Sequence, residues 1–433
     1  MSTLRTLKTI PVAVILLLAL TASLQAQEVF DAVRANDLAK VKELVEKDAS
    51  RVNLKDQNGN TPLHIAARQG RIDVAAFLIE KGAVLEAKSP TGYTPLFAAA
   101  QSKQPEAVQF FLDKGADVNA QTKFQTTPLF AAAESGNVEV IRLLVERGAQ
   151  VNHVSPFFGS PLHRAANMNF PEAAKVLLDA GADLKATDRY RRSPLHMAAQ
   201  LGRVTIARLL IERGADLNAV DAGNQTPLHY AIRAGTDGTG VNNSTEFGFL
   251  LMEKGARVDL ADKDGATPLV WAVRQGYTEL AGAILRRGGA IETREPGTGR
   301  TLLHLTALKG YGDLAELLLA RGLDASVKDA DGKTALDYAR EHGNTTVALR
   351  LASPCLEMGG IEIGARFLSR KLTDAEAYIW VLNRRGWAVK TKSHLYVFDN
   401  EELGRKYPGL EFGLFRDAGD RLHYRRRIVD RRP

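Results

Sequence analysis

Apolar residues recur along this chain in short blocks separated by polar turns. In residues 61–82, the block PLHIAA is followed by a polar turn and then by IDVAAFLI, where apolar residues return every three or four positions. That spacing predicts helices with one buried face. The Thr-Pro pair predicts a helix start, because threonine caps a helix and proline fits its first turn. Gly82 predicts a helix end, so each block predicts two short helices joined by a turn.

The same block returns with a period of 33 residues. The signature TPLHIAARQG at 61 reappears in related forms at 94, 127, 160, 193, 226, 267, 301 and 334, with one spacing of 41 and one of 34. A second signature, such as GADVNA at 115 and GADLNA at 214, keeps the same phase. One block cannot bury its own apolar face, so neighbouring blocks are expected to stack.

This period and signature resemble the ankyrin repeat. The resemblance covers residues 28–352 and implies a mainly α-helical solenoid of about ten stacked helix-turn-helix units. Segments 28–55 and 329–352 depart from the signature and are expected to cap the two ends. Residues 235–246 fall within the 41-residue spacing and are rich in Gly, Asn, Ser and Thr, which predicts an insertion loop.

Histidine occupies the fourth place of the signature in five blocks, at His64, His163, His196, His229 and His304. Stacked helices lie roughly 8 to 10 Å apart, too far for neighbouring histidines to share a zinc ion whose bonds are about 2 Å long. Phe97, Phe130 and Val270 fill the same place in sister blocks, which a catalytic position would not tolerate. The resemblance implies instead that this histidine ties one unit to the next by hydrogen bonds.

A binding surface is expected on the concave side, where ankyrin proteins receive their partners. Aromatic residues and arginine dominate the energetics of protein interfaces. The predicted partner-binding residues are Tyr93, Phe124, Phe157, Phe158, Arg189, Tyr190, Arg191 and Arg192 on the hairpins, with Met168 and Gln200 at the ends of first helices. A second interpretation is that some of these residues, especially Phe157 and Phe158, pack against the adjacent hairpin.

The C-terminal extension, 353–433, lacks the period. Residues 377–400 predict two strands around Arg385-Gly386 and resemble the opening hairpin of metallo-β-lactamase-fold hydrolases. That family depends on a His-x-His-x-Asp-His cluster, and after His394 only His423 remains, so no metal-binding residue carries over. The extension is either a shortened hydrolase segment or a basic surface in which Arg425, Arg426 and Arg427 contact anionic lipid or nucleic acid.

Residues 1–26 have the layout of a secretory signal peptide, with Arg5 and Lys8 before an apolar run and a cut expected near Ala26. A retained membrane anchor is the competing interpretation, although the run from Ile10 to Leu20 is shorter than the roughly 20 residues of a spanning helix. The lone Cys355 excludes an internal disulfide. Of the formal net charge of +7, the extension carries 16 basic against 11 acidic residues.

Together these patterns predict an exported scaffold, periplasmic or secreted, that binds a protein partner of unknown identity. They predict no catalysis, cofactor, metal ion or nucleic-acid partner, no membrane span after signal cleavage, and a monomer. Motifs of zinc proteases, P-loop enzymes and serine hydrolases are absent from the sequence. The alternative is an array that recruits a substrate or partner for a truncated or missing metallo-β-lactamase-like hydrolase domain.

Overall fold

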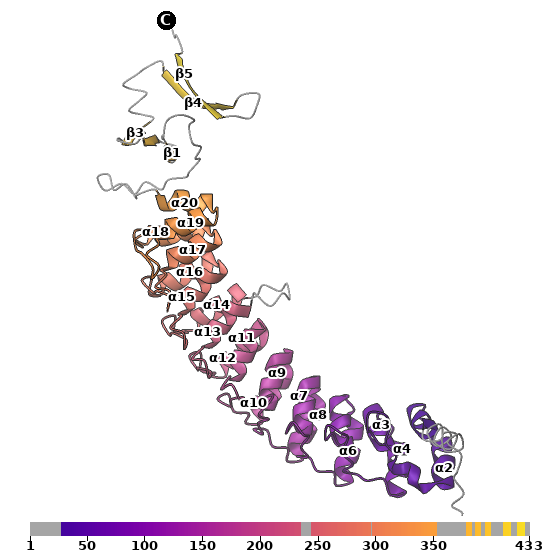
Figure 1. The fold of residues 1–433 in the computed structure, drawn as a ribbon. Coiled ribbons are helices and arrows are strands. Elements are labelled where there is room, and N and C mark those ends of the chain that lie inside the picture. Colours follow the sequence, from indigo (N-terminus) through magenta and orange to yellow (C-terminus); the bar gives the residue numbers. More distant parts are fainter. Residues whose placement is uncertain are drawn as a thin grey trace, which may run out of the picture. The chain divides into compact units, whose positions relative to one another are not determined.

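The structure is a computed structural model that describes residues 27–234, 244–295 and 297–352, together with the backbones of five strands between residues 378 and 428. The predicted signal peptide, 1–26, and residues 235–243 of the predicted insertion lie outside the described residues. The chain divides into two compact units, Met1–Ala290 (unit 1) and Ile291–Pro433 (unit 2). Both units contain helix pairs of the predicted kind (Figure 1).

Unit 1 opens with the predicted cap. Residues 27–34 are helical, and α2 (Leu38–Lys47) and the 3-10 helix η1 (Ala49–Asn53) follow. Asp37 caps α2 by accepting the backbone N–H of Lys40 over 2.9 Å. The exposed side of α2 carries charged residues, whereas Val41, Leu44 and Val45 are buried. An end unit of this kind covers the apolar face of the next helix pair with one side and meets water with the other.

The first helices of the repeated units begin at the predicted proline or directly after the predicted threonine or serine cap. In unit 1 they are α3 (Pro62–Gln69), α5 (Pro95–Gln101), α7 (Pro128–Ser135), α9 (Pro161–Met168), α11 (Pro194–Gln200), α13 (Pro227–Arg233) and α15 (Pro268–Gln275). Their leucine and alanine positions are almost fully buried, as at Leu129 and Ala132. Alanine at the contact lets consecutive first helices approach closely, so α3, α5, α7, α9, α11, α13 and α15 pack side by side in that order.

The second helices carry the longer apolar residues. In unit 1 they are α4 (Ile72–Glu80), α6 (Pro105–Asp113), α8 (Val138–Glu146), α10 (Pro171–Asp179), α12 (Val204–Glu212), α14 (Ser244–Glu253) and α16 (Thr278–Arg286). Helix α14 includes residues 244–246, which the sequence analysis assigned to the insertion loop. Gly148 after α8 has φ +85°, and no atom lies within 4 Å of where a Cβ would be, so it is the backbone angle that requires glycine there.

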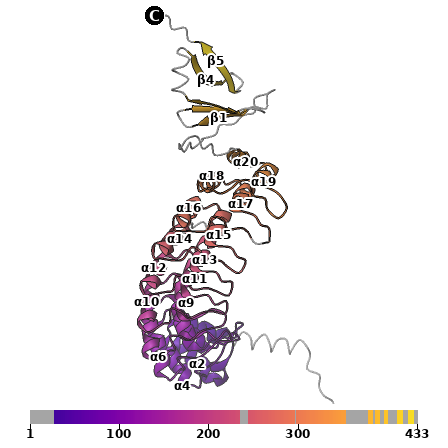
Figure 2. The ribbon, with the colours of Figure 1, turned by 90° about the vertical axis from the view of Figure 1, so that its left-hand side faces the viewer.

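The helices of unit 1 form two layers. Figure 2 shows α10, α12, α14 and α16 on one side and α9, α11, α13 and α15 on the other, with the connecting hairpins beyond the first helices. The buried leucines and alanines of the first helices and the valines, isoleucines and leucines of the second helices fill the space between the layers. The alanines of the first helices leave room for the longer side chains of the second helices in this shared core.

Unit 2 contains the last repeats and the extension. Its helices are α17 (Leu302–Lys309), α18 (Gly312–Ala320), α19 (Ala335–Glu341) and α20 (Thr345–Ala352). Helix α17 packs against α19, and α18 packs against α20, as in unit 1. With the eight helix pairs of unit 1, the part of the chain that the structure describes contains ten helix pairs, which agrees with the sequence prediction.

The extension contains two antiparallel sheets. One has the order β1 (Tyr378–Leu382), β2 (Gly386–Lys390) and β3 (Leu395–Asp399). Leu382 pairs with Gly386 in the β1–β2 hairpin, at the place where the sequence predicts a turn. The third strand and the separate pair β4 (Leu410–Arg416) and β5 (Leu422–Ile428) were not predicted. The arginines proposed to contact lipid, 425–427, lie on β5, whose side chains are outside the described residues.

Candidate protein-binding surface

The signature histidines link each repeat, that is, each helix pair with its hairpin, to the next repeat. The backbone N–H of Thr61 donates to Nδ1 of His64 over 3.1 Å, and Nε2 of His64 lies 2.8 Å from the carbonyl oxygen of Tyr93 in the next hairpin. A carbonyl only accepts and a backbone N–H only donates, so the ring is neutral with its hydrogen on Nε2. The other four rings repeat this arrangement, with Nε2 bound to the carbonyls of Arg192, Gln225, Ala266 and Lys333 at 2.9, 3.0, 3.2 and 3.0 Å.

Burial favours the neutral form of four of these rings. It lowers the pKa of His64, His196 and His229 below the ordinary value, and it lowers the pKa of His163 to about 4. Both ring nitrogens are already engaged by the protein, so none is available to a substrate or a metal ion. The structural interpretation of the signature histidines is therefore confirmed.

In three repeats an apolar residue occupies the fourth place of the signature, where other repeats have histidine. Phe97, Phe130 and Val270 are 3%, 6% and 0% exposed. The ring of Phe97 stacks on Tyr93 at a centroid distance of 4.4 Å, and the ring of Phe130 lies 6.0 Å from that of Phe158. The ring of Phe130 thus contacts the next hairpin where other repeats place a histidine hydrogen bond, whereas the ring of Phe97 packs on the hairpin of its own repeat.

The last repeat changes this position again. Asp337 accepts the backbone N–H and the hydroxyl of Thr334 over 2.9 and 2.7 Å, and these hydrogen bonds lower the pKa of its carboxyl. Asp337 thus caps its own helix as Nδ1 of histidine does elsewhere. The short carboxylate does not reach onward as an imidazole ring does, which suits a closing unit.

The hairpins before the first helices are of two kinds. At Asp188, Asp221 and Asp262 the carboxylate Oδ1 accepts two backbone N–H groups of its own hairpin, over 2.7 to 3.0 Å. Thr122 and Ser155 take the same place in the central hairpins and offer a hydroxyl. The central hairpins are also those that face Phe97 and Phe130 rather than histidine.

Three phenylalanines on the central hairpins lie together and remain exposed. The ring of Phe124 meets those of Phe157 and Phe158 edge-on, each at a centroid distance of 5.9 Å. The three residues are 40%, 45% and 45% exposed. Phe157 and Phe158 therefore pack against the neighbouring hairpin, as the second interpretation expects, and they still present apolar surface to solvent.

Two arginines extend this cluster onto the next hairpin. The guanidinium carbon of Arg189 lies 5.9 Å from the ring centroid of Phe157 and 4.5 Å from that of Tyr190. Arg192 covers the same tyrosine at 4.9 Å, binds Asp188 over 2.7 Å and donates to Oε1 of Gln200 over 3.0 Å. The contact with Gln200 shows that hairpin and first-helix end share one surface, as the sequence analysis expected.

The predicted residues do not all join this surface. Phe124, Phe157, Phe158, Arg189, Tyr190, Arg192 and Gln200 are connected by the contacts above; we call them the hairpin patch. Tyr93 is half-buried against Phe97, and Arg191 and Met168 are exposed, with no contact to the patch among the described residues. Arg191 has φ +60°, which places it at the tip of its hairpin.

The structure also shows an arrangement that the sequence analysis missed. Trp271 on α15 lies between the guanidinium groups of Arg233 and Arg274, each 5.1 Å from its ring, and donates to Asp262 over 2.9 Å. Arg164 pairs with Glu134 of the preceding first helix. The signal was present in the sequence, since these residues occupy the fifth and eighth places of the signature, where side chains of consecutive first helices meet.

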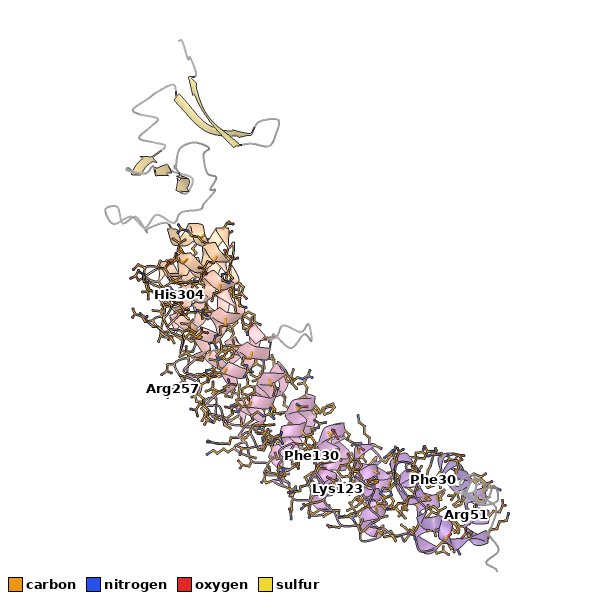
Figure 3. All side chains as sticks on the ribbon, viewed as in Figure 1. Phe30, Arg51, Lys123, Phe130, Arg257 and His304 are labelled. Carbon is orange, nitrogen blue, oxygen red and sulfur yellow. The ribbon has the colours of Figure 1, made fainter. Side chains whose placement is uncertain are left out.

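Ligand-binding features of other kinds are not found in the described parts of the chain. No group of three or more His, Cys, Asp or Glu residues there could hold a metal ion. The described helices include none that is long and apolar enough to cross a bilayer. The exposed rings and guanidinium groups of the hairpin patch form an apolar and cationic contact surface. Figure 3 shows Phe130 and Lys123 in this region of unit 1.

Comparison with family models identifies the repeats. Models described as ankyrin repeats match residues 29–122, 117–188 and 162–239, and a further ankyrin-repeat model matches residues 284–339. Among solved structures, the ankyrin repeat domain of human ASB11 is 28% identical, with a TM-score of 0.47 over 53% of this chain and 99% of that domain.

Several curated proteins match over short stretches. The potassium channel AKT3 of Oryza sativa subsp. japonica is 38% identical over 74 residues, which are 17% of this chain and 8% of the channel. The ARF GTPase-activating proteins GIT2 and GIT1 of Homo sapiens are each 37% identical over 76 residues, 18% of this chain and 10% of theirs. The matched segment thus spans about a tenth or less of the length of these relatives.

Proposed function

Because this chain belongs to the ankyrin-repeat family, we propose that it is an exported, noncatalytic scaffold that holds a protein partner on its hairpin patch. The observation that carries the proposal is the exposed aromatic surface of Phe124, Phe157, Phe158 and Tyr190, 40% to 45% exposed in rings that are fixed by contacts with one another. Rings already held in place lose little conformational entropy on binding. Aromatic and arginine side chains of this kind supply most of the energy in protein interfaces.

A capture experiment tests this function. We expect the purified chain to retain a partner from the envelope fraction of its native cells, and the triple variant Phe124→Ala/Phe157→Ala/Tyr190→Ala to lose it. Arg192 is left unchanged because its ion pair with buried Asp188 stabilises the hairpin. Phe249→Ala is the matched control, since Phe249 is a 36% exposed phenylalanine on the second-helix layer. Equal capture by all three proteins would contradict the proposal, and thermal melting checks that the triple variant is folded.

Export rests on residues 1–26 and has its own test. We expect the mature protein in the periplasm or medium to begin near Gln27, as determined by mass spectrometry of its N-terminal peptide. An intact N-terminus in the membrane fraction would support the retained anchor instead.

A second candidate function is recruitment for a metallo-β-lactamase-like hydrolase that is truncated here or supplied by another chain. The antiparallel pair β1–β2 in the segment that resembles the opening hairpin of that family favours it. Stoichiometric zinc or hydrolytic turnover in the purified chain would select this function over the noncatalytic scaffold.

A further inference from the structure

The phenylalanines of the hairpin patch provide an apolar anchor point. Phe124, Phe157 and Phe158 touch one another at centroid distances of 5.9 to 6.3 Å, from two adjacent hairpins. Phe158 is also held from below by buried Phe130. Edge-on packing leaves part of each ring facing solvent, and covering that surface with an apolar side chain is favourable. The site therefore fits a large aliphatic or aromatic side chain of a partner.

The charge around these rings has one sign. The hairpin segments 121–126, 154–159 and 187–192 carry four basic residues and one acidic residue, Asp188. The side chain of Asp188 is 2% exposed and already binds Arg192, so it offers nothing to a partner. The other three cations are exposed and, within the described residues, have no carboxylate within 4.0 Å: Lys123, Arg189 and Arg191.

Two exposed arginines of the second helices have acidic partners. Arg147 binds Asp113 over 2.9 Å, and Arg213 binds Asp179 over 2.8 Å, in each case between consecutive second helices. On the hairpins, Lys123, Arg189 and Arg191 are each next in sequence to Phe124 or Tyr190, so their charge lies beside the exposed rings. An uncompensated field of one sign attracts a segment of opposite charge and accelerates its association.

Arg189 is arranged to bind a carboxylate. Its guanidinium carbon lies over the ring of Tyr190 and near that of Phe157, and the group contacts the Tyr190 hydroxyl. A guanidinium group that stacks through its face keeps N–H groups along its edge, and these match the two oxygens of a carboxylate. Because the rings already hold the group, binding costs little side-chain entropy.

We propose that the hairpin patch, with Lys123 and Arg191 at its rim, binds an extended acidic peptide segment in which a large apolar side chain lies about three residues from a carboxylate. The inference rests on the scaffold function and specifies the chemistry of the partner. Adjacent units are roughly 8 to 10 Å apart, which is the length of about three extended residues. An apolar side chain on Phe124 and Phe157 therefore places a carboxylate of the same peptide at Arg189.

A selection from a random dodecapeptide library on the immobilised full chain tests the proposal. The peptides selected are expected to combine Asp or Glu with Leu, Phe or Trp at a spacing of about three residues. The charge variant Lys123→Glu/Arg189→Glu/Arg191→Glu should bind the selected peptides at least about tenfold more weakly. So should Phe157→Ala, whereas the control Phe249→Ala should bind them as the unchanged chain does. Binding should weaken as salt is raised, since the charges involved are exposed.

The outcomes separate this inference from the scaffold function. Peptides without acidic residues that are lost in Phe157→Ala would overturn the acidic partner and leave the scaffold intact. Peptides retained by both variants would overturn the hairpin patch as the site and with it both proposals. Failure to select any peptide, with binding of phosphatidylserine-rich vesicles that the charge variant abolishes, would overturn the peptide in favour of a lipid surface. Circular dichroism confirms that each variant is folded.

Discussion

Two sets of hairpins in unit 1 are held by different physical means. Hairpins 188–192 and 221–225 receive a histidine hydrogen bond from the preceding unit and are closed by a buried aspartate. Hairpins 122–126 and 155–159 face Phe97 and Phe130 and are closed by a hydroxyl. Both sets have hydrogen bonds within the hairpin, but the first set is tied to the preceding helix by a histidine, and hairpin 155–159 is contacted there by the ring of Phe130.

A backbone hydrogen bond between consecutive hairpins is missing at one hairpin of the second set, 155–159, although Lys123 of the other donates to the carbonyl of Thr91 over 2.9 Å. Ala222 donates its N–H to the carbonyl of Tyr190 over 2.8 Å, and Lys263 donates to Gly223 over 2.9 Å, so consecutive hairpins are joined directly. In the hairpin 155–159 the equivalent residue is Pro156, which has no N–H to donate. Ser155 supplies a substitute by donating its hydroxyl to the carbonyl of Phe124 over 2.7 Å. The exposed aromatic surface thus lies where the series of backbone hydrogen bonds between consecutive hairpins is interrupted. The same position of the repeat can therefore serve either regular stacking or a surface for binding.

The largest expected effect on stability comes from removing the buried ring of Phe130, which contacts Phe158 of the hairpin patch. Phe130→Ala should lower the free energy of unfolding by about 4 kcal/mol, because it removes a buried ring and leaves a cavity under Phe158. Urea unfolding of the full chain measures this. Phe158→Ala is the control and should cost less than about 1 kcal/mol, since that ring is 45% exposed. Similar losses of stability in the two variants would contradict the assignment of Phe130 as the buried supporting ring and Phe158 as the exposed one.

Acid should weaken the histidine-linked hairpins selectively. The folded state holds the pKa of His163 at about 4, below the ordinary 6.5, so the unfolded chain binds more protons between these values. The stability that comes from the neutral ring is complete above about pH 6.5 and is lost as the pH falls toward 4. For His163 alone the loss is roughly 3 kcal/mol.

A comparison with the variant His163→Phe separates the loss of stability caused by protonation of His163 from the loss caused by titration of carboxylates. Between pH 7 and pH 4 the unfolding free energy of the unchanged chain should fall more steeply than that of the variant. Parallel pH profiles would contradict a buried neutral imidazole at this position.

The smallest expected effect on stability comes from replacing a signature histidine with the phenylalanine that other repeats have at the same place. His196→Phe should destabilise the chain by about 2 kcal/mol, because the backbone N–H of Ser193 and the carbonyl of Gln225 lose their partner on the ring. Amide hydrogen exchange in residues 221–225 should become faster. Unchanged stability would mean that phenylalanine suits this place in any unit, and the distinction between the two sets of hairpins would fail.

Much of the fold was predictable because the repeat is written in local chemistry. Thr61 followed by Pro62 marks a helix start, and the glycine at 148 marks a helix end through its positive φ. The aromatic and arginine residues of the hairpins could be named for the same reason, since they depart from the repeated signature. Their grouping could not be predicted: Tyr93 turned out to stack on Phe97, away from Phe124, and Arg192 to be bound to Asp188.

The sequence by itself determined the helix pairs, their order and the residues free to vary, because caps, periodicity and glycine act over a few neighbouring positions. Only the tertiary structure decided which side chains meet across units that are about 33 residues apart in the chain. The contacts of Phe124 with Phe157, and of Arg189 with Tyr190 and Phe157, depend on how closely adjacent hairpins stack and which rotamers that spacing allows. Those distances are set by the packing of the alanine-rich helices beneath them.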